Sequence, residues 1–387
     1  MNKIIYLDYY RTTKISELVT EKMKPYQDDN FYLPVSFTQL GTDIAEAIED
    51  SIVRIKKAFN APHSEVIFAS SGTHANNMVI QGILRDAEPE NTSIVTSVID
   101  HPSINNVFDY YKKKGFEVKK IKVDSEGFWN TEMLSENLNE KTRLVSITLV
   151  NHTIGTVQRY DELKKIIHEK APNALIHLDI TMAVMTQKID FEELEADFMT
   201  LSGHKIYGPK GIGVVIARKP IKIKPITFGT VVTSPFAPGA DNVPGIVGIS
   251  YAIEQAVLER ETYDSKTRKL QRLLMNQIEK NIDKIELNGP ADERASDNVN
   301  YSFRQIEGES IMMFLDFEGI IVATGSACAS SDLKVNYILS AIGRDHEMAH
   351  GSLRITLGRE TTEEDINRFV EQLIPIVKRL RDQSTIR

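Results

Sequence analysis

Two reactive side chains lie far apart in the sequence, one a thiol and the other an amine. Cys328 is the only cysteine among the 387 residues and lies in the small-residue segment 323–331. Lys205 lies directly before the glycine-rich segment 206–213. A cysteine thiolate is a strong nucleophile, and a lysine amine can form a Schiff base with an aldehyde cofactor. Together these two groups could remove sulfur from an amino acid.

The composition is that of an ordinary soluble globular protein. The chain is 41% hydrophobic and 26% charged, and its length suits two domains. The formal net charge of −8 argues against nucleic-acid binding, because phosphate recognition needs clustered Lys and Arg. No apolar stretch reaches the roughly 18 residues of a membrane span, and residues 1–8 become charged too early for a signal peptide. We therefore expect a cytoplasmic protein that binds neither nucleic acid nor membranes.

Short β-branched runs alternate with amphipathic stretches from about residue 14 to residue 250. This alternation predicts an α/β fold whose mostly parallel sheet is covered on both faces by helices. The later part of the chain predicts an α+β unit, and the Pro- and Gly-rich segment 234–248 is expected to be a hinge or crossing loop. The expected strands are 65–68, 93–96, 143–150, 174–179, 198–201, 298–303 and 353–357, and the expected helices are 43–59, 73–85, 161–170, 248–283, 309–318 and 362–381.

Polar residues follow successive strands of the predicted parallel sheet, where ligands of open sheets collect. The turn 69–77 opens a helix, so its N–H groups and the Thr73 hydroxyl could bind a phosphate, although a capped surface helix has the same pattern. His101 could stack on an aromatic cofactor, unless it is a structural histidine. Asp179 could keep a pyridine nitrogen protonated, unless it is a helix N-cap. Asn151 follows the strand that lies between these two in sequence.

One motif suggests a metal but is poorly placed for one. Residues 346–350 match the H-E-x-x-H pattern of zinc proteases, which needs both histidines on one face of a sustained helix. Gly343 and Gly351 bracket the motif too tightly for such a helix, and a strand is expected to begin by Leu353. We therefore expect no metal site.

Three separated segments resemble, in the same order, those of the cysteine desulfurases, which are pyridoxal-phosphate enzymes of the class V aminotransferase group. Segment 202–213 is similar to the family's cofactor-lysine segment, and segment 324–328 resembles its nucleophile segment. Segment 349–354 resembles the stretch whose arginine binds the substrate carboxylate. The resemblance runs from Tyr6 to about Arg381.

The resemblance implies the fold type I architecture of these enzymes. A large domain, residues 14–250, would hold a mostly parallel seven-stranded sheet between helices. A smaller α+β domain, formed by residues 1–13 and 251–387, would carry the nucleophilic cysteine and the carboxylate-binding arginine. The family also implies a homodimer.

The resemblance implies a role for each polar group. Lys205 would bind the aldehyde of pyridoxal 5′-phosphate, and Asp179 would pair with its pyridine nitrogen. Cys328 would attack the sulfur of L-cysteine, which leaves a persulfide on Cys328 and releases L-alanine. His101 would stack on the ring and act as acid and base, and Arg354 would bind the substrate carboxylate. The other cofactor contacts would come from Thr73, His74, Asn151, Met182, Ser202 and His204, with Asn151 also near the substrate.

The segment that follows the cysteine implies direct delivery of sulfur. Residues 328–334 resemble the longer mobile loop of the subgroup that hands its persulfide to partner proteins. The sulfur acceptor would be a protein such as an iron–sulfur scaffold or a tRNA thiolation enzyme.

Several positions depart from the family pattern. Residues 9–11 read Tyr-Tyr-Arg where small residues are expected, and His74 and His152 replace other family residues. Met182 replaces a glutamine that would donate to the ring hydroxyl, and a thioether cannot donate. Ala240 lacks the hydroxyl with which a neighbouring subunit would bind the phosphate. Each lost hydrogen bond to a charged or polarised group costs roughly 1.5 to 3 kcal/mol if nothing replaces it.

Three functions remain open from the sequence. The first is an active cysteine desulfurase. The second is another class V enzyme, such as a selenocysteine lyase or an aminotransferase, which the cysteine-bearing loop disfavours. The third is a non-enzymatic assembly or regulatory protein that binds cofactor poorly. We favour the first, because the chain keeps Lys205, Asp179, His101, Arg354 and Cys328.

Overall fold

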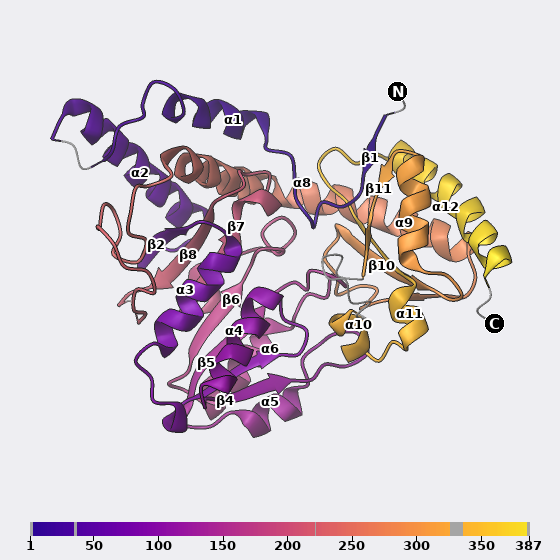
Figure 1. Cartoon of the computed structure of the whole chain (residues 1–387), viewed down its shortest axis with the longest axis horizontal. Coiled ribbons are helices and arrows are strands. Elements are labelled where there is room, and N and C mark those ends of the chain that lie inside the picture. The colour runs from indigo at the N-terminus through magenta and orange to yellow at the C-terminus, as the bar shows by residue number, and fades with distance from the viewer. Residues whose placement is uncertain (1–2, 35–36, 221, 326–335, 385–387) are drawn as a thin grey trace.

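The structure is a computed structural model that describes residues 3–34, 37–220, 222–325 and 336–384. Within these residues, seven strands form one sheet in the order β2-β8-β7-β6-β5-β3-β4. β8 is antiparallel to both of its neighbours, and the other neighbouring pairs are parallel. The predicted α/β fold with a mostly parallel seven-stranded sheet is therefore confirmed (Figure 1). The strands are β2 (Ser64–Ala69), β3 (Ser93–Ser97), β4 (Glu117–Ile121), β5 (Thr142–Thr148), β6 (Leu175–Asp179), β7 (Phe198–Ser202) and β8 (Gly213–Arg218).

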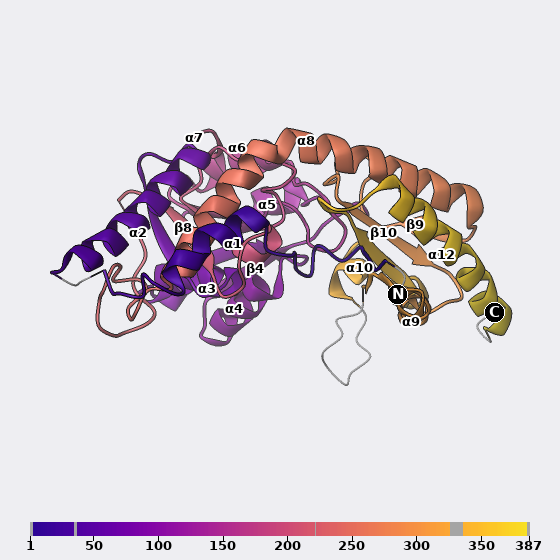
Figure 2. The same ribbon diagram turned by 90° about the horizontal axis from the view of Figure 1, so that it is seen from above.

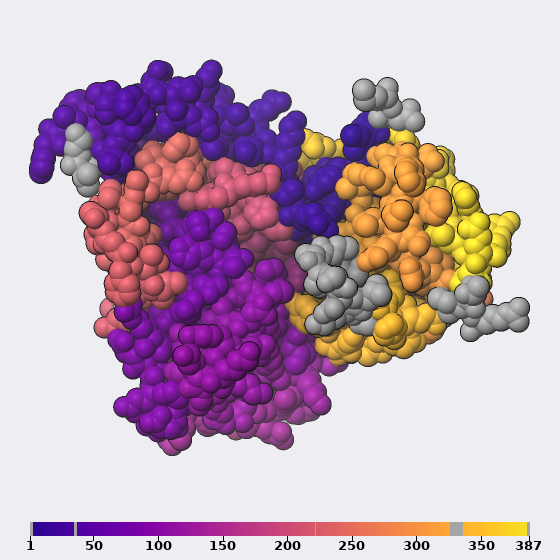
Figure 3. Space-filling view, viewed as in Figure 1, coloured from indigo at the N-terminus to yellow at the C-terminus, as the bar shows by residue number. Residues whose placement is uncertain are grey.

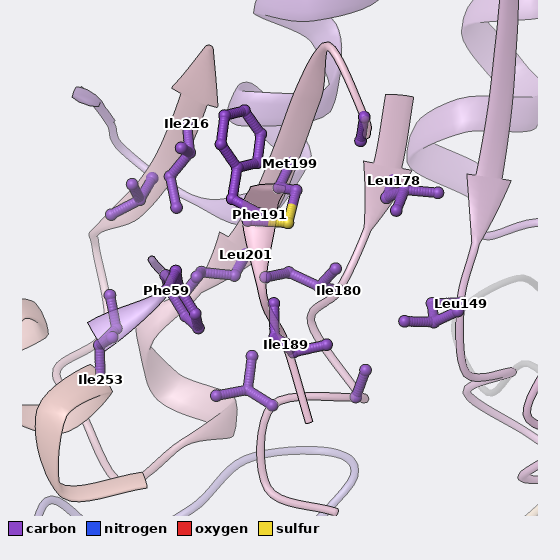
Figure 4. Close-up of a cluster of buried hydrophobic side chains, with 14 of the residues drawn as sticks. Phe59, Leu149, Leu178, Ile180, Ile189, Phe191, Met199, Leu201, Ile216 and Ile253 are labelled. Atoms are coloured by element: carbon purple, nitrogen blue, oxygen red, sulfur yellow. The ribbon is translucent and has the colours of Figure 1, made fainter. Parts of the chain in front are cut away.

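Helices cover both faces of this sheet, because alternate side chains of each strand point to opposite faces. Leu144 and Phe198 belong to the hydrophobic cluster beneath α3 and α4. Their neighbours Val145 and Met199 belong to the cluster beneath α1, α2, α5, α6 and the first half of α8, part of which is drawn in Figure 4. These helices are α1 (Glu17–Met23), α2 (Gln39–Ala58), α3 (Gly72–Leu84), α4 (Pro102–Lys113), α5 (Thr131–Asn137), α6 (Tyr160–Lys170) and α8 (Val243–Asn281).

A second core lies around the far half of α8. Ala256 of this helix packs in the core of the large sheet, whereas Leu270 and Ile278 pack in the second core. Figure 2 shows α8 running along both parts of the molecule. The second core is built on a sheet in the order β12-β13-β10-β9, all of whose pairs are antiparallel. Its elements are β9 (Ile285–Leu287), β10 (Asn298–Phe303), α9 (Gly308–Phe317), β12 (Ala323–Thr324), β13 (Ser352–Thr356) and α12 (Glu363–Gln383).

The N-terminal segment joins this second part. β1 (Ile5–Tyr6) pairs in parallel with β11 (Ile320–Ile321), and residue Asp8 forms an isolated bridge with Thr356. In the space-filling view the indigo N-terminal segment lies at the junction of the two parts of the molecule (Figure 3). The division into residues 14–250 and residues 1–13 with 251–387 remains our proposal, and its boundary at residue 250 falls inside α8.

The expected loop at 234–248 was partly wrong. α8 begins at Val243, and Asn242 caps it by accepting a hydrogen bond from the Gly245 N–H at 3.1 Å. Pro244 lies in the first turn, where a missing N–H costs nothing because no intrahelical acceptor is available. No helix among the described residues is long and apolar enough to cross a membrane.

Candidate active site

A cavity of about 340 Å³ opens where the strands β2, β5, β6 and β7 end. The carboxyl ends of parallel strands share one edge of a sheet, so the residues that follow them converge there. β13 and the N-terminal segment complete the wall with Arg354, Tyr10 and Arg11. The cavity brings together most of the residues predicted from the sequence: Thr73, His101, Asp179, Met182, Ser202, His204, Lys205 and Arg354. Cys328 lies outside the described residues.

Asp179 is the last residue of β6 and is buried. Its Oδ2 accepts a hydrogen bond from Asn76 Nδ2 at 2.9 Å, and its Oδ1 accepts one from the Thr181 N–H at 2.9 Å. Thr200 in turn donates to Asn76 Oδ1 at 2.5 Å. These bonds hold the carboxylate at the cavity wall in one orientation. A carboxylate held in this way can keep a ring nitrogen of a ligand protonated.

His101 lines the cavity as the N-cap of α4. Its Nδ1 accepts from the Ser103 N–H at 3.1 Å and lies 2.8 Å from Ser103 Oγ. The Ser103 hydroxyl oxygen already accepts from Asn76 Nδ2 at 2.8 Å, so its own proton points to His101. The network therefore assigns the ring proton to Nε2. Burial lowers the pKa of His101, which favours a neutral ring that can stack on a cofactor and exchange a proton.

His152 is a second imidazole in this wall. The rings of His101 and His152 meet edge to face with centroids 4.9 Å apart. Burial lowers the pKa of His152 well below its ordinary value, and the nearby His101 lowers it further. Two neutral imidazoles therefore lie side by side at this end of the cavity.

Lys205 ends the short 3-10 turn Gly203–Lys205 that directly follows β7. Its Nζ donates to the carbonyl oxygen of Arg11 at 2.8 Å and also to that of Tyr10. Burial lowers the pKa of Lys205 to about 8, and the positive charge of Arg354 adds to this effect. A lysine with so low a pKa is partly neutral near pH 7, and the neutral amine is the form that attacks an aldehyde.

The lowered pKa predicts how capture of the cofactor depends on pH. The rate at which cofactor-free protein binds pyridoxal phosphate is expected to rise about tenfold per pH unit below pH 8 and to level off above it, because only neutral Lys205 reacts. Removing the positive charge in Arg354→Gln is expected to move this midpoint to higher pH. Stopped-flow absorption across a pH series measures both. A midpoint near the 10.5 of an ordinary lysine in the unchanged protein would contradict the assignment.

One end of the cavity has the features of a phosphate site. The first turn of α3 presents the N–H groups of Gly72 and Thr73, which have no intrahelical acceptor, together with the positive end of the helix dipole. A Cβ on Gly72 would lie 2.9 Å from the Cβ of Ser202, so only glycine lets α3 approach β7 so closely. Burial lowers the pKa of His204 to about 4. A phosphate here would therefore be bound by N–H and hydroxyl donors and a neutral imidazole.

Two residues predicted to contact the cofactor do not line the cavity. Ser70 donates its backbone N–H to His74 Nδ1 at 3.3 Å, which holds that ring in the turn before α3. Asn151 shapes its own loop, because its Oδ1 accepts from the N–H groups of Thr153 at 2.9 Å and Ile154 at 3.1 Å. Its Nδ2 donates to the carbonyl oxygen of Ile99 at 3.1 Å. Neither side chain lines the cavity, and their contacts with the cofactor remain predictions.

Arg354 projects from β13 toward the same cavity. Its Nη1 donates to the carbonyl oxygen of His152 at 3.0 Å, and its Nη2 donates to Asp8 Oδ1 at 2.8 Å. Its Nε is buried and has no hydrogen-bond partner among the described residues. A guanidinium in the cavity wall suits the carboxylate of an amino acid.

The two tyrosines that replace small residues do not fill the cavity. Tyr9 is buried in the core with its ring 5.0 Å from that of Tyr6. Tyr10 lines the cavity, but its hydroxyl points away and donates to Asp297 Oδ1 at 2.8 Å. Burial raises the pKa of Asp297 to about 7, although Tyr263 also donates to it at 3.1 Å. The substituted N-terminal segment thus narrows the site without closing it.

The residues present fit pyridoxal phosphate. Lys205 offers an amine, Asp179 a carboxylate for the ring nitrogen, His101 a flat ring, and the first turn of α3 a phosphate cradle. Met182 also lines the cavity, but its thioether cannot donate to the ring hydroxyl. Among the residues that the structure describes, no group of three or more His, Cys, Asp and Glu could hold a metal ion.

The sequence did not point to Asn76, Ser103 or Thr181 as parts of the site. Asn76 and Ser103 lie on α3 and α4 and act through side chains of other elements. Their roles depend on how helices pack against the sheet, which no local pattern reports. Thr181, two residues after Asp179, acts through its backbone N–H, to which its residue type gives no clue.

Comparison with known proteins places the chain in a family. The profile of the class V aminotransferases matches residues 5–369. A cysteine desulfurase IscS of Dictyoglomus turgidum is 39% identical over 381 residues, which cover 98% of this chain and 96% of that protein. A cysteine desulfurase IscS 1 of Archaeoglobus fulgidus is 36% identical over 381 residues, which cover 98% of this chain and 99% of that protein.

Solved structures agree with these relatives. A NifS-like protein superposes with a TM-score of 0.91 at 28% identity, over 97% of this chain and 100% of the other. The structure described as SspA in complex with cysteine superposes with a TM-score of 0.80 at 26% identity, over 91% of this chain and 98% of the other. The chain therefore belongs to the class V aminotransferase family and, within it, to the cysteine desulfurases, which depend on pyridoxal phosphate.

Proposed function

We infer that this protein is a cysteine desulfurase that converts L-cysteine to L-alanine and leaves the sulfur as a persulfide on Cys328. The observation that carries this inference is one cavity lined by Lys205, Asp179, His101 and Arg354. An amine, a carboxylate, an imidazole and a guanidinium are the groups that pyridoxal-phosphate chemistry on an amino acid requires. Relatives named cysteine desulfurase over nearly the whole chain support the same conclusion.

Each of these residues has a task that its surroundings suit. Bound pyridoxal phosphate supplies an electron sink for the charge that develops on the substrate's α-carbon. Neutral Lys205 can take the α-proton, because its lowered pKa leaves it partly unprotonated. His101, with its proton on Nε2, can exchange a proton with the substrate thiol. Arg354 binds the substrate carboxylate and so fixes which group faces the amine.

Sulfur transfer needs a thiolate, and Cys328 is the only cysteine in the sequence. Its sulfur forms a bond to the substrate sulfur while the substrate's carbon–sulfur bond breaks. The electron pair of that bond stays with the carbon fragment, which is released as L-alanine after protonation. The products are one persulfide and one L-alanine for each L-cysteine.

Release of sulfide from L-cysteine in the presence of a thiol reductant tests this function. The wild-type holoenzyme is expected to be coloured and to release sulfide and L-alanine in equal amounts. The variant Cys328→Ser is expected to keep the visible absorption and to lose sulfide release. Turnover of the amino acid that survives in Cys328→Ser would point to an aminotransferase instead. Protein that stays colourless after pyridoxal phosphate is added would point to a non-enzymatic role.

We also propose that the protein is a cytoplasmic homodimer. Large hydrophobic side chains are exposed in two segments at one end of the molecule, among them Phe31, Phe37, Phe228 and Val231. Figures 1 and 2 both show these segments at the end of the molecule opposite α12. Apolar exposure of this kind is typical of a covered interface. Sedimentation equilibrium of the wild-type protein and of Phe228→Glu tests the dimer, and cell fractionation tests the location.

We propose that the persulfide passes to a partner protein, such as an iron–sulfur scaffold or a tRNA thiolation enzyme. The support is the likeness of residues 328–334 to the loop of desulfurases that deliver sulfur directly. Radiolabelled sulfur from L-cysteine should move from this protein to a purified acceptor, and a chain that only releases free sulfide would contradict the proposal.

A further inference from the structure

Asp8 forms an ion pair with Arg354, the arginine that would bind the substrate carboxylate. Asp8 is only 2% exposed, and its Oδ1 lies 2.8 Å from Nη2 of Arg354. Its other oxygen, Oδ2, lies 2.7 Å from Nε of Arg11. The backbone of Asp8 is fixed beside β13 by its bridge with Thr356. One buried carboxylate is therefore shared between two guanidinium groups at the cavity wall.

A substrate carboxylate that binds Arg354 meets Asp8 at the same guanidinium. A guanidinium binds a carboxylate at two points either through Nε and Nη2 or through Nη1 and Nη2, so both modes use Nη2. Asp8 already holds Nη2, and a second carboxylate brought to the same nitrogen is repelled by the first. Nη1 is engaged by the carbonyl oxygen of His152, and Nε is buried without a partner among the described residues. Each mode uses a different hydrogen of Nη2, so a substrate carboxylate bound at two points lies against the carboxylate of Asp8 and is repelled by it unless Asp8 leaves Nη2.

Arg11 is the second cation with which Asp8 can pair when it leaves Arg354. Its side chain is 62% exposed, lines the cavity and is already bonded to Oδ2 of Asp8. A short movement of the exposed guanidinium would let it take both oxygens of Asp8.

We propose that Asp8 is an internal competitor for the substrate-binding arginine, and that Arg11 is a positioning residue that draws Asp8 away when the substrate's carboxylate arrives. The proposal rests on the proposed function, because it takes Arg354 as the site of an amino-acid carboxylate. The ion pair between Asp8 and Arg11 explains why Nε of Arg354 has no partner among the described residues, because it keeps Asp8 from bonding Nε as well as Nη2. Without Arg11, Asp8 is free to bond Nε and Nη2 together and so to close the site against the substrate.

Binding of L-alanine to the holoenzyme measures the effect without turnover, because L-alanine has the same carboxylate and no sulfur. Isothermal titration calorimetry is expected to show that Arg11→Ala weakens L-alanine binding about tenfold, the size of one lost charge-assisted contact. The KM for L-cysteine is expected to rise by a similar factor, with kcat within about twofold of the wild-type value. Arg11→Lys keeps a charge beside Asp8 and is expected to bind L-alanine within about threefold of wild type.

The variant Asp8→Asn shows whether Asp8 competes with the substrate for Arg354 or instead holds Arg354 in position for it. If Asp8 competes, Asp8→Asn binds L-alanine at least as tightly as wild type, and adding Arg11→Ala to it changes binding by less than about twofold. Weaker binding in Asp8→Asn would make Asp8 a support for Arg354 and overturn the proposal. An undiminished effect of Arg11→Ala in the double variant would make Arg11 a direct contact and also overturn it.

The single variants decide the question if Asp8→Asn does not fold. Wild-type affinity in Arg11→Ala, or an Arg11→Lys protein as weak as Arg11→Ala, would contradict a role for Arg11 through the charge of Asp8. A holoenzyme that binds L-alanine but releases no sulfur from L-cysteine would contradict the proposed function alone. The two failures are therefore distinguishable.

Discussion

Replacing Lys205 by alanine is expected to remove the visible absorption of the lysine-bound cofactor and to lower kcat for L-cysteine by at least about a thousandfold. Lys205 is the one lysine that lines the cavity within the described residues. The variant therefore loses both the group that binds the cofactor's aldehyde and the base for the α-proton. Absorption spectra and sulfide release measured with excess pyridoxal phosphate check both effects.

Lys210 provides the matched control for this variant. It lies five residues further along the chain and is exposed, and it does not line the cavity. Lys210→Ala is expected to keep the absorption and activity of the wild-type protein. A Lys205→Ala protein that stayed coloured and active would show that another amine binds the cofactor, and the site described here would then be wrong.

Replacing Asp179 by asparagine is expected to lower kcat by about a hundredfold to a thousandfold while the cofactor still binds. A neutral amide cannot hold the ring nitrogen protonated, so the electron sink weakens. The amide also fits poorly, because Asn76 and the Thr181 N–H both present donors to this side chain and an amide has only one acceptor oxygen. Steady-state kinetics with L-cysteine and absorption spectra of the holoenzyme measure the two consequences.

Asp161 on α6 provides the matched control, because the same substitution of aspartate by asparagine is made there at an exposed position. Asp161→Asn is expected to leave kcat unchanged, because its side chain is 95% exposed and lies outside the cavity. Equal kcat in Asp179→Asn and the wild-type protein would mean that the ring nitrogen is not held by this carboxylate.

The positions of the main site residues could be predicted from the sequence because strand ends are visible in it. His101 and Asp179 each follow a buried β-branched run, and such residues meet at one edge of a parallel sheet. Lys205 was predicted from its place beside a glycine-rich segment, and Arg354 from a segment that resembles one of a known family. Both kinds of prediction depend on features that are continuous in the chain.

Other parts of the site depend on the direction of side chains and could not be predicted. His74 follows Thr73 directly, yet its ring accepts a hydrogen bond from the Ser70 N–H and does not line the cavity. The side-chain oxygen of Asn151 accepts hydrogen bonds within its own loop, and its side-chain nitrogen donates to Ile99. The pairing of Asp8 with Arg354 joins residues 346 positions apart and has no local signature. Two strands of the large sheet were also missed: β4 is rich in charged residues, and β8 follows a glycine-rich turn.

During turnover the sulfur of L-cysteine is expected to become bound to Cys328. Mass spectrometry of the holoenzyme after brief exposure to L-cysteine without reductant is expected to show a gain of one or more sulfur atoms on the peptide that contains Cys328. L-alanine should form at the same time, and neither Cys328→Ser nor Lys205→Ala should gain sulfur. L-alanine produced by the wild-type protein without any sulfur on Cys328 would show that sulfur transfer does not pass through this cysteine.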